Sequence, residues 1–137
     1  RESAWYARRR VERKYQGWYY PSMATDRPIP VSFFRLDSGR EPTREWLRGL
    51  DQAAKQTIGQ DVKTLQYGWP IGMPLARKME ADLWELRSTL PNGIARLLFT
   101  LWDGHIVLLH GFVKKSQKTP KDDLALAKRR LTKLRST

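Results

Sequence analysis

The chain has 137 residues, 40% of them apolar, which is enough for one compact domain with a core and too little for two. It carries 26 Lys and Arg against 14 Asp and Glu, a formal net charge of +12, and it has no cysteine and two histidines. This composition excludes disulfides, thiolate metal sites and a cysteine nucleophile. No run approaches the roughly 18 apolar residues of a membrane span, so we expect a cytoplasmic protein with no membrane partner. With no cysteine and only two histidines, we also expect no metal ion and no cofactor.

The positive charge is concentrated at the two ends of the chain. Residues 1–22 hold six basic and two acidic residues, and residues 113–137 hold nine basic and two acidic ones. Between them, residues 23–112 hold eleven basic and ten acidic residues and are nearly neutral. Charge that is gathered in this way favours a polyanionic partner over a general role in solubility.

The first thirty residues are expected to be an extension that precedes the domain. They mix six aromatic residues with arginines and end in a proline-flanked stretch typical of a linker. Met23 would be a suitable start, so residues 1–22 are either an upstream extension, the product of a misassigned start, or vector-derived sequence. An arm that contacts RNA by stacking is the functional alternative to an incidental extension, and we assign the segment no chemistry. The domain is predicted at residues 31–137.

A strand and two helices are predicted next. Residues 31–36 are rich in β-forming residues and precede a turn signal. A short helix opens at Pro42, and residues 52–67 place apolar side chains at helical spacing up to Gly68, so the two helices form a hairpin. Residues 69–82 hold two prolines and a glycine and predict a loop that delivers basic side chains to the following strand.

Three strands follow in quick succession, at residues 83–88, 94–102 and 105–115. The last two are joined by Asp103-Gly104, a dipeptide typical of tight hairpins. Short connections of this kind predict an antiparallel meander.

The chain ends in a helix. Thr119 is the predicted N-cap, Pro120 the first helical residue, and the helix is expected to run to about Arg135. The whole order predicts an α+β domain: an antiparallel sheet of about four strands, with a two-helix hairpin packed on one face and a C-terminal helix.

Alternate residues of a strand face opposite sides of a sheet, which sorts the charged residues of the three strands. Val107 and Leu109 are expected on the apolar face and Leu108 on the other. Burial of the apolar face fixes the register. The opposite face then collects Glu85, Arg87, Arg96, Leu98, His110, Phe112 and Lys114, with Lys115 and Lys118 at its rim.

This set has two interpretations. One is the solvated side of a half-buried sheet, with Glu85 pairing Arg87 or Arg96 and His110 making a local hydrogen bond. The other is a functional surface, favoured because several cations accompany a single carboxylate and Phe112 lies among them.

Metal-free RNA cleavage needs a base for the attacking 2′-OH, cations for the phosphate, an acid for the leaving 5′-oxygen and a flat group for a nucleobase. Arg87, Arg96 and Lys114 suit the phosphate. The base is open between His110, Glu85 and a lysine whose pKa is lowered by neighbouring cations.

A longer motif supports the functional interpretation. The run "LWELRSTLPNGIARLLFTLWDGHIVLLHGFVKKSQKTPKDDLALAKRRL" resembles the HigB-like, phage-derived branch of the RelE/ParE toxin superfamily, in its LWELR strand, its LLHGFxKKxxKTP segment and the A-x-x-R helix after it. The similarity extends over about residues 31–135. It implies a RelE-like fold and a toxin of a type II toxin–antitoxin system. That toxin would be a metal-independent, ribosome-dependent endoribonuclease that cleaves mRNA at the A site, contacts ribosomal RNA and is silenced by a helix-turn-helix antitoxin of the HigA type.

The resemblance also implies which residues act. Basic working residues of the superfamily fall on Lys78, Arg87, Arg96 and the Lys114–Lys115 pair, while no tyrosine follows Tyr67, so His110 or Phe112 takes the place of a C-terminal tyrosine or histidine. We therefore predict a catalytic set of Arg87, Arg96, His110 and Lys114. The predicted RNA-binding set is Lys78, Phe112, Lys115 and Lys118.

Two other functions fit the same resemblance. ParE-type relatives share the fold but inhibit DNA gyrase without catalysis. A degenerate module would bind only RNA or an antitoxin, with the strong salt dependence of a charged interface and no cleavage.

Overall fold

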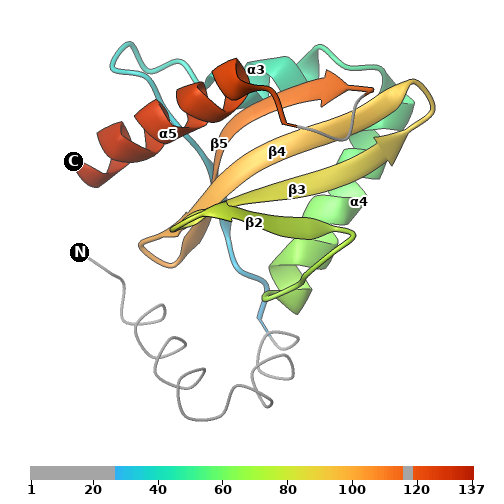
Figure 1. The fold of residues 1–137 in the computed structure, drawn as a ribbon, viewed down its shortest axis with the longest axis horizontal. Coiled ribbons are helices and arrows are strands. Elements are labelled where there is room, and N and C mark those ends of the chain that lie inside the picture. The colour runs from blue at the N-terminus through green and yellow to red at the C-terminus, as the bar shows by residue number, and fades with distance from the viewer. Residues whose placement is uncertain (1–26, 116–118) are drawn as a thin grey trace.

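The computed structural model describes residues 27–115 and 119–137, so the predicted extension at residues 1–22 and the predicted RNA contact Lys118 lie outside the described residues. The elements shown in Figure 1 are β1 (Val31–Phe33), α3 (Pro42–Arg48), α4 (Gln52–Gly68), β2 (Ala76–Glu80), β3 (Leu83–Leu90), β4 (Gly93–Trp102), β5 (His105–Lys114) and α5 (Lys121–Arg135). The α+β class and the three predicted helices of this region are confirmed.

The strands form one mixed sheet in the order β1-β5-β4-β3-β2. Strands β3 to β5 pair antiparallel as predicted, and β2 adds a further antiparallel strand beside β3, but β1 pairs parallel with β5. The prediction of about four strands in a purely antiparallel sheet is therefore wrong. The chain between β1 and β5 is long enough to carry β5 back in the same direction as β1, which a tight hairpin cannot do.

The fifth strand is β2, which lies inside the segment predicted as a loop. Pro70 and Pro74 both precede it, so they interrupt the chain after α4 without entering the strand. The strand itself reads ARKME, and its register with β3 shifts between Lys78 and Glu80. Charged residues and a bulge are typical of an edge strand, which has a neighbouring strand on one side only. They also obscure the alternating pattern by which a strand is recognised in a sequence.

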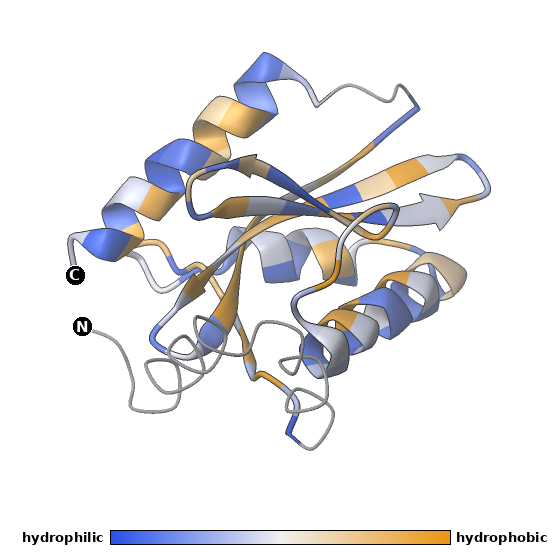
Figure 2. Cartoon of the chain, turned by 60° about the horizontal axis from the view of Figure 1, so that its bottom comes forward, coloured by the Kyte–Doolittle hydropathy of each residue, from blue (hydrophilic) through white to orange (hydrophobic). Residues whose placement is uncertain are grey.

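Helices cover both faces of the sheet, whereas the sequence predicted packing on one face. Figure 2 shows α5 on one side of the sheet and α3 and α4 on the other. One apolar cluster joins Ile58 and Leu65 of α4 to Leu86, Leu97 and Phe99 of the sheet. The second cluster lies under α5 and contains Phe34, Leu83, Leu98, Val107, Leu109, Ala127 and Leu131.

A bulge in β5 explains the second cluster. The register between β4 and β5 shifts so that His110 pairs with Leu98 while Leu108 pairs with Phe99, leaving Leu109 as the extra residue. One extra residue inverts the alternation along the rest of the strand. The predicted facing of Val107, Leu108 and Leu109 is therefore wrong: Leu108 joins the cluster under α4, and the other two lie under α5.

Two helices meet the sheet through specific contacts. Trp46 of α3 packs over Gly111 of β5, where an added Cβ would lie 2.5 Å from the indole ring. On the other face Arg130 of α5 donates a hydrogen bond of 2.7 Å to the carbonyl of Leu109. Within the described part of the chain, no helix is both long enough and apolar enough to span a membrane.

Helix α5 does not begin as predicted. Its N-cap is Pro120 rather than Thr119, and no side chain caps it. Thr119 is buried, and its hydroxyl instead joins a polar cluster on the sheet. The helix packs on the sheet through Ala127 and Leu131, which are both buried.

Candidate functional site

The register of β2 to β5 assembles a charged face on the α5 side of the sheet. Across the strands, Arg77 lies opposite Glu85, Glu85 opposite Leu98, and Leu98 opposite His110. The next row on this face contains Arg87, Arg96 and Phe112, and the row after it contains Thr89, Ile94 and Lys114. The register therefore brings the predicted set of Glu85, Arg87, Arg96, Leu98, His110, Phe112 and Lys114 onto one face, whereas Leu108, predicted on the same face, lies on the other.

The centre of the charged face is buried. Glu85 and Arg96 are both fully buried, and Arg96 Nη1 lies 3.7 Å from Glu85 Oε2. The other carboxylate oxygen, Oε1, lies 3.7 Å from Nε of Arg87, whose side chain is 10% exposed. Thr119 donates its hydroxyl to Glu85 and accepts a hydrogen bond of 3.2 Å from Arg96 Nη1. Thr119, which lies just before α5, therefore ties the start of that helix to the sheet.

Electrostatics make this centre a concentrated positive region. Burial lowers the pKa of Arg96; the charge of Glu85 opposes that shift, while the charges of Arg87 and Arg77 add to it. One carboxylate thus faces three guanidinium groups, Arg77, Arg87 and Arg96, near enough to affect one another. An anion placed above Arg87 would lie in a field that is little screened by solvent.

His110 lies beside this centre and is paired with a carboxylate. Its Nε2 is 2.7 Å from Oδ1 of Asp123, in the first turn of α5. The His110 side chain is 16% exposed, and its ring stacks on Phe112 with centroids 5.5 Å apart and an interplanar angle of 28°. The arrangement combines a titratable group, an orienting carboxylate and a flat aromatic ring at the border of the positive region.

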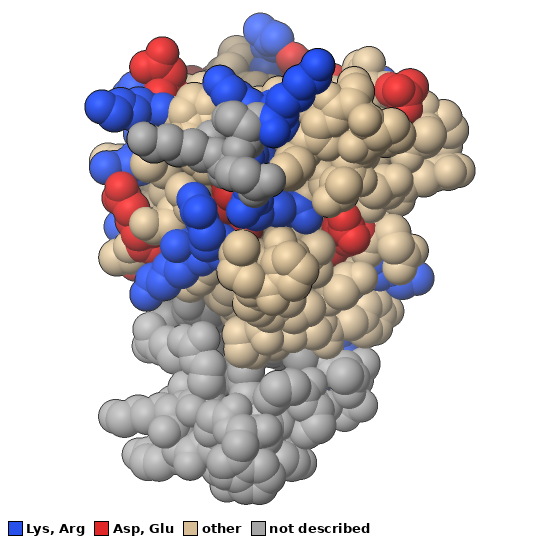
Figure 3. Space-filling view, turned by 45° about the vertical axis from the view of Figure 1, so that its right-hand side comes forward, with Lys and Arg blue, Asp and Glu red and all other residues tan. Residues whose placement is uncertain are grey.

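The remaining predicted cations lie at the edges. Lys114 and Lys115 are exposed where β5 ends, and Figure 3 shows Lys and Arg side chains grouped over part of the face at this end of the sheet. Lys78 is exposed on β2, but it pairs with Trp84, whose ring packs on the α4 side. Its neighbour Arg77, opposite Glu85, is the residue of this strand that lies on the charged face.

Residues 45–132, nearly two thirds of the chain, match the family described as "Phage derived protein Gp49-like". This chain belongs to the Gp49-like family. The family is a phage-derived branch of the RelE/HigB-type toxins, so the chain is a toxin-like domain and a toxin–antitoxin pairing is compatible with it. No curated protein matches the chain.

The match with the Gp49-like family includes the whole charged face and Asp123. Sequence reasoning missed three of its members, Arg77, Thr119 and Asp123. Arg77 was not predicted on this face because the sequence pattern of its strand indicates a loop. Thr119 was not predicted there because a Thr-Pro pair is also a signal for the start of a helix. Asp123 could have been found from the acidic first turn of the final helix, since Asp122 and Asp123 are the acidic residues there.

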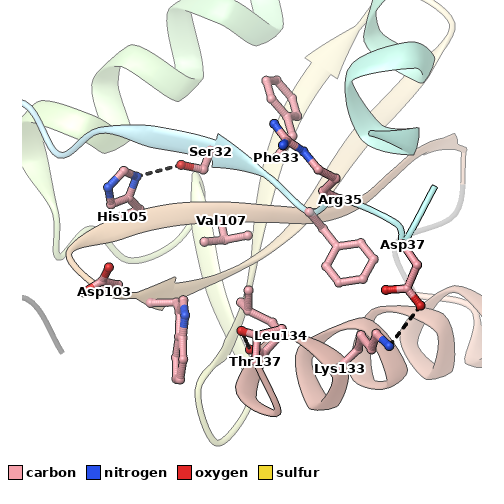
Figure 4. Close-up of a pocket in the computed structure, with 12 residues that line it drawn as sticks. Ser32, Phe33, Arg35, Asp37, Asp103, His105, Val107, Lys133, Leu134 and Thr137 are labelled. Atoms are coloured by element: carbon pink, nitrogen blue, oxygen red, sulfur yellow. Dashed lines mark hydrogen bonds and ion pairs between the residues drawn. The ribbon is translucent and has the colours of Figure 1, made fainter. Parts of the chain in front are cut away.

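A separate pocket lies at the other end of β5 (Figure 4). It has a volume of about 330 Å³, and Ser32 Oγ lies 2.6 Å from His105 Nδ1 at its side. The basic residues that line it are ion-paired: Lys133 lies 3.2 Å from Asp37, and Arg35 lies 3.1 Å from Glu41. The charged face is therefore the stronger candidate for an anionic ligand.

Within residues 27–115 and 119–137, no three His, Asp or Glu side chains lie close enough together to hold a metal ion. His110 and Asp123 form a pair without a third ligand of this kind. Side-chain chemistry and positive charge are what the charged face offers.

Proposed function

We propose that this protein is the toxin of a type II toxin–antitoxin system and that it cleaves mRNA in the ribosomal A site without a metal ion. The observation that carries the proposal is the His110–Asp123 pair, which stacks on Phe112 at the border of a buried arginine cluster. A Gp49-like domain of the RelE/HigB-type toxins supports the same class.

The proposed reaction is an internal transfer at phosphorus. The 2′-oxygen of the substrate attacks the adjacent phosphate, and its proton passes to His110. The bond between phosphorus and the 5′-oxygen breaks, leaving a 2′,3′-cyclic phosphate on one fragment and a 5′-hydroxyl on the other. The 5′-oxygen gains its proton from Lys114 or Lys115, the exposed donors at this end of the sheet.

The arginines stabilise the negative charge that develops on the phosphate. Arg87 borders the buried centre and is the guanidinium we place against the phosphate. Arg96 is fully buried, so its contribution is the positive field and the fixed position of Glu85 and Thr119. A preorganised cation of this kind requires no rearrangement when the charge forms.

Stacking and peripheral contacts position the RNA. Phe112 offers the face of its ring to a nucleobase, a contact that does not depend on base identity. Lys115 and the exposed Lys78 of the edge strand are proposed phosphate contacts, as is Lys118. The strongly basic segment from residue 113 to 137 is proposed to grip ribosomal RNA.

The proposed partners follow from this role. They are mRNA on the ribosome, ribosomal RNA and a helix-turn-helix antitoxin of the HigA type, and the proposed compartment is the cytoplasm. The domain is proposed to comprise residues 31–137. Ile29, which is fully buried, is held just before it by a hydrogen bond of 3.0 Å from its backbone N–H to the carbonyl of Gln66.

Controlled expression in a bacterial host tests the proposal. Wild-type protein should arrest growth and leave reporter mRNA cut within its coding region, while plasmid supercoiling stays normal. Relaxed plasmid with intact mRNA would instead identify a gyrase inhibitor. RNA binding without either effect would identify a module that only binds.

A further inference from the structure

We infer that Asp123 is a positioning residue: its carboxylate fixes the tautomer of His110 so that Nδ1 is the nitrogen that accepts a proton. The inference rests on the proposed function for its catalytic meaning, but the tautomer itself is a property of the folded protein. Neither the family match nor the sequence motifs single out this pair.

The hydrogen bond determines which nitrogen carries the proton. Oδ1 of Asp123 lies 2.7 Å from Nε2 of His110, well within hydrogen-bonding distance. A carboxylate accepts hydrogen bonds and does not donate them, so in the neutral ring Nε2 must carry the hydrogen. The lone pair is then on Nδ1. Within the described residues Nδ1 has no hydrogen-bond partner, and it is the nitrogen that we assign to the substrate hydroxyl.

The position of Asp123 is fixed by contacts other than its bond to His110. Thr119, four residues earlier, is tied to the buried Glu85 and Arg96. Further along α5, Ala127 is fully buried against the sheet, and Arg130 bonds the carbonyl of Leu109. The carboxylate is therefore held by a helix that is anchored on both sides of it, and it imposes its geometry on the imidazole.

Phe112 restrains the same ring from a different direction. It is two residues from His110 on the same strand face, and the two rings stack at 5.5 Å. Stacking limits the tilt of the imidazole, while the carboxylate fixes its rotation about the axis of the side chain. A base held in this way meets its substrate in one orientation, which is how orienting carboxylates assist histidine in other enzymes.

Asp122 provides a matched control for the electrostatics of the helix. It lies in the same first turn of α5 as Asp123, but its side chain is exposed, and the carboxylate that pairs with His110 is that of Asp123. Asp122→Asn removes the same charge from the same helix end, so any general effect on the helix dipole appears in both variants. Only Asp123→Asn changes the partner of Nε2.

The first test measures the imidazole directly by ¹⁵N NMR on the purified full chain, above the pH at which His110 is protonated. Wild type and Asp122→Asn should show the Nε2–H tautomer of His110. Asp123→Asn can turn its amide NH₂ toward Nε2 and should shift the population to Nδ1–H. An Nδ1–H tautomer in the wild type, or no change in Asp123→Asn, would overturn the inference.

The second test measures mRNA cleavage on translating ribosomes by the same variants. Asp123→Asn should lower kcat on the order of 10²-fold with KM little changed, because general-base catalysis contributes about this much. Asp123→Glu should restore part of the rate, and Asp122→Asn should match wild type. Equal rates for Asp123→Asn and wild type would overturn the positioning role.

The two tests separate this inference from the proposed function. If the wild type holds the Nε2–H tautomer and Asp123→Asn loses it, but the wild type cuts no mRNA, the structural inference stands and the ribonuclease proposal fails. If the wild type cuts mRNA but its His110 tautomer is Nδ1–H, the ribonuclease proposal stands and the structural inference fails.

Discussion

The hydroxyl of Thr119 donates a hydrogen bond to the buried carboxylate of Glu85 and accepts one of 3.2 Å from Arg96. This one side chain links the segment before α5 to the centre of the charged face. Because Asp123 follows on the same helix, the buried polar cluster and the His110 pair are parts of one structure. Substitutions in the buried polar cluster should therefore lower the stability of the fold and, through the position of α5, the activity as well.

Replacing Thr119 by Val tests this link. Valine has a similar shape but leaves the buried carboxylate of Glu85 without its hydroxyl donor, which we expect to lower the free energy of unfolding by about 1–3 kcal/mol. Urea denaturation measures the change. The control is Thr132→Val on the exposed side of α5, whose hydroxyl bonds only the carbonyl of Lys128. Equal effects at the two sites would contradict a special role for Thr119.

The ion pair between Glu85 and Arg96 should show strong coupling. Arg96→Met alone leaves Glu85 buried with one fewer cation, and we expect a loss of about 3–5 kcal/mol in the free energy of unfolding. Glu85→Leu alone leaves Arg96 facing Arg77 and Arg87, with a similar loss. The double variant should be more stable than the sum of the two losses predicts, because no charge of the pair is left unmatched. Additive losses in denaturation would show that the two groups do not interact.

Gly111 is predicted to be required for the approach of α3. A Cβ there would lie 2.5 Å and 2.6 Å from two atoms of the Trp46 ring and 3.0 Å from Leu97, so Gly111→Ala should cost about 1–3 kcal/mol through overpacking. Gly59 in α4 is the control, since a Cβ there meets nothing within 4 Å. Gly59→Ala should stabilise the protein by up to about 1 kcal/mol, as alanine favours helix. Thermal or urea unfolding of both variants separates the packing effect from the general effect of adding a methyl group.

The limits of prediction from sequence follow from the same residues. The two-residue period placed Arg87, Arg96, His110, Phe112 and Lys114 on one face, because alternation needs only local sequence. It could not show that Arg96 is buried, because the burial of Arg96 involves Thr119, which is 23 residues away in the sequence and contacts Arg96 only in the folded protein.

The missed features of the sheet have a similar cause. The bulge at Leu109 lies in a continuous apolar run, in which an extra residue leaves no trace in hydropathy. Strand β2 is short and charged because it is an edge, so its pattern resembles a loop. Both become visible only when the partner strand is known.

RNA binding should depend on salt through the lysines at the end of β5. For single-stranded RNA the slope of log K against log salt changes by about 0.7 for each phosphate contact. Lys114→Gln with Lys115→Gln should therefore reduce the slope by about 1.4, measured by fluorescence anisotropy with a short oligonucleotide. Lys63→Gln changes an exposed lysine on α4, away from the charged face, and should leave the slope unaltered. An equal reduction by Lys63→Gln would place the binding surface elsewhere.

The most direct test of the central claim is cleavage of a defined mRNA on purified translating ribosomes, read by primer extension. Wild type should cut within the A-site codon and should leave the same mRNA intact when ribosomes are absent. His110→Ala and Lys114→Ala should each cut on the order of 10²-fold more slowly. Two results would contradict a ribonuclease site on the charged face. One is mRNA that stays intact on the ribosomes although the wild-type protein stops growth when it is expressed. The other is cleavage that neither substitution slows.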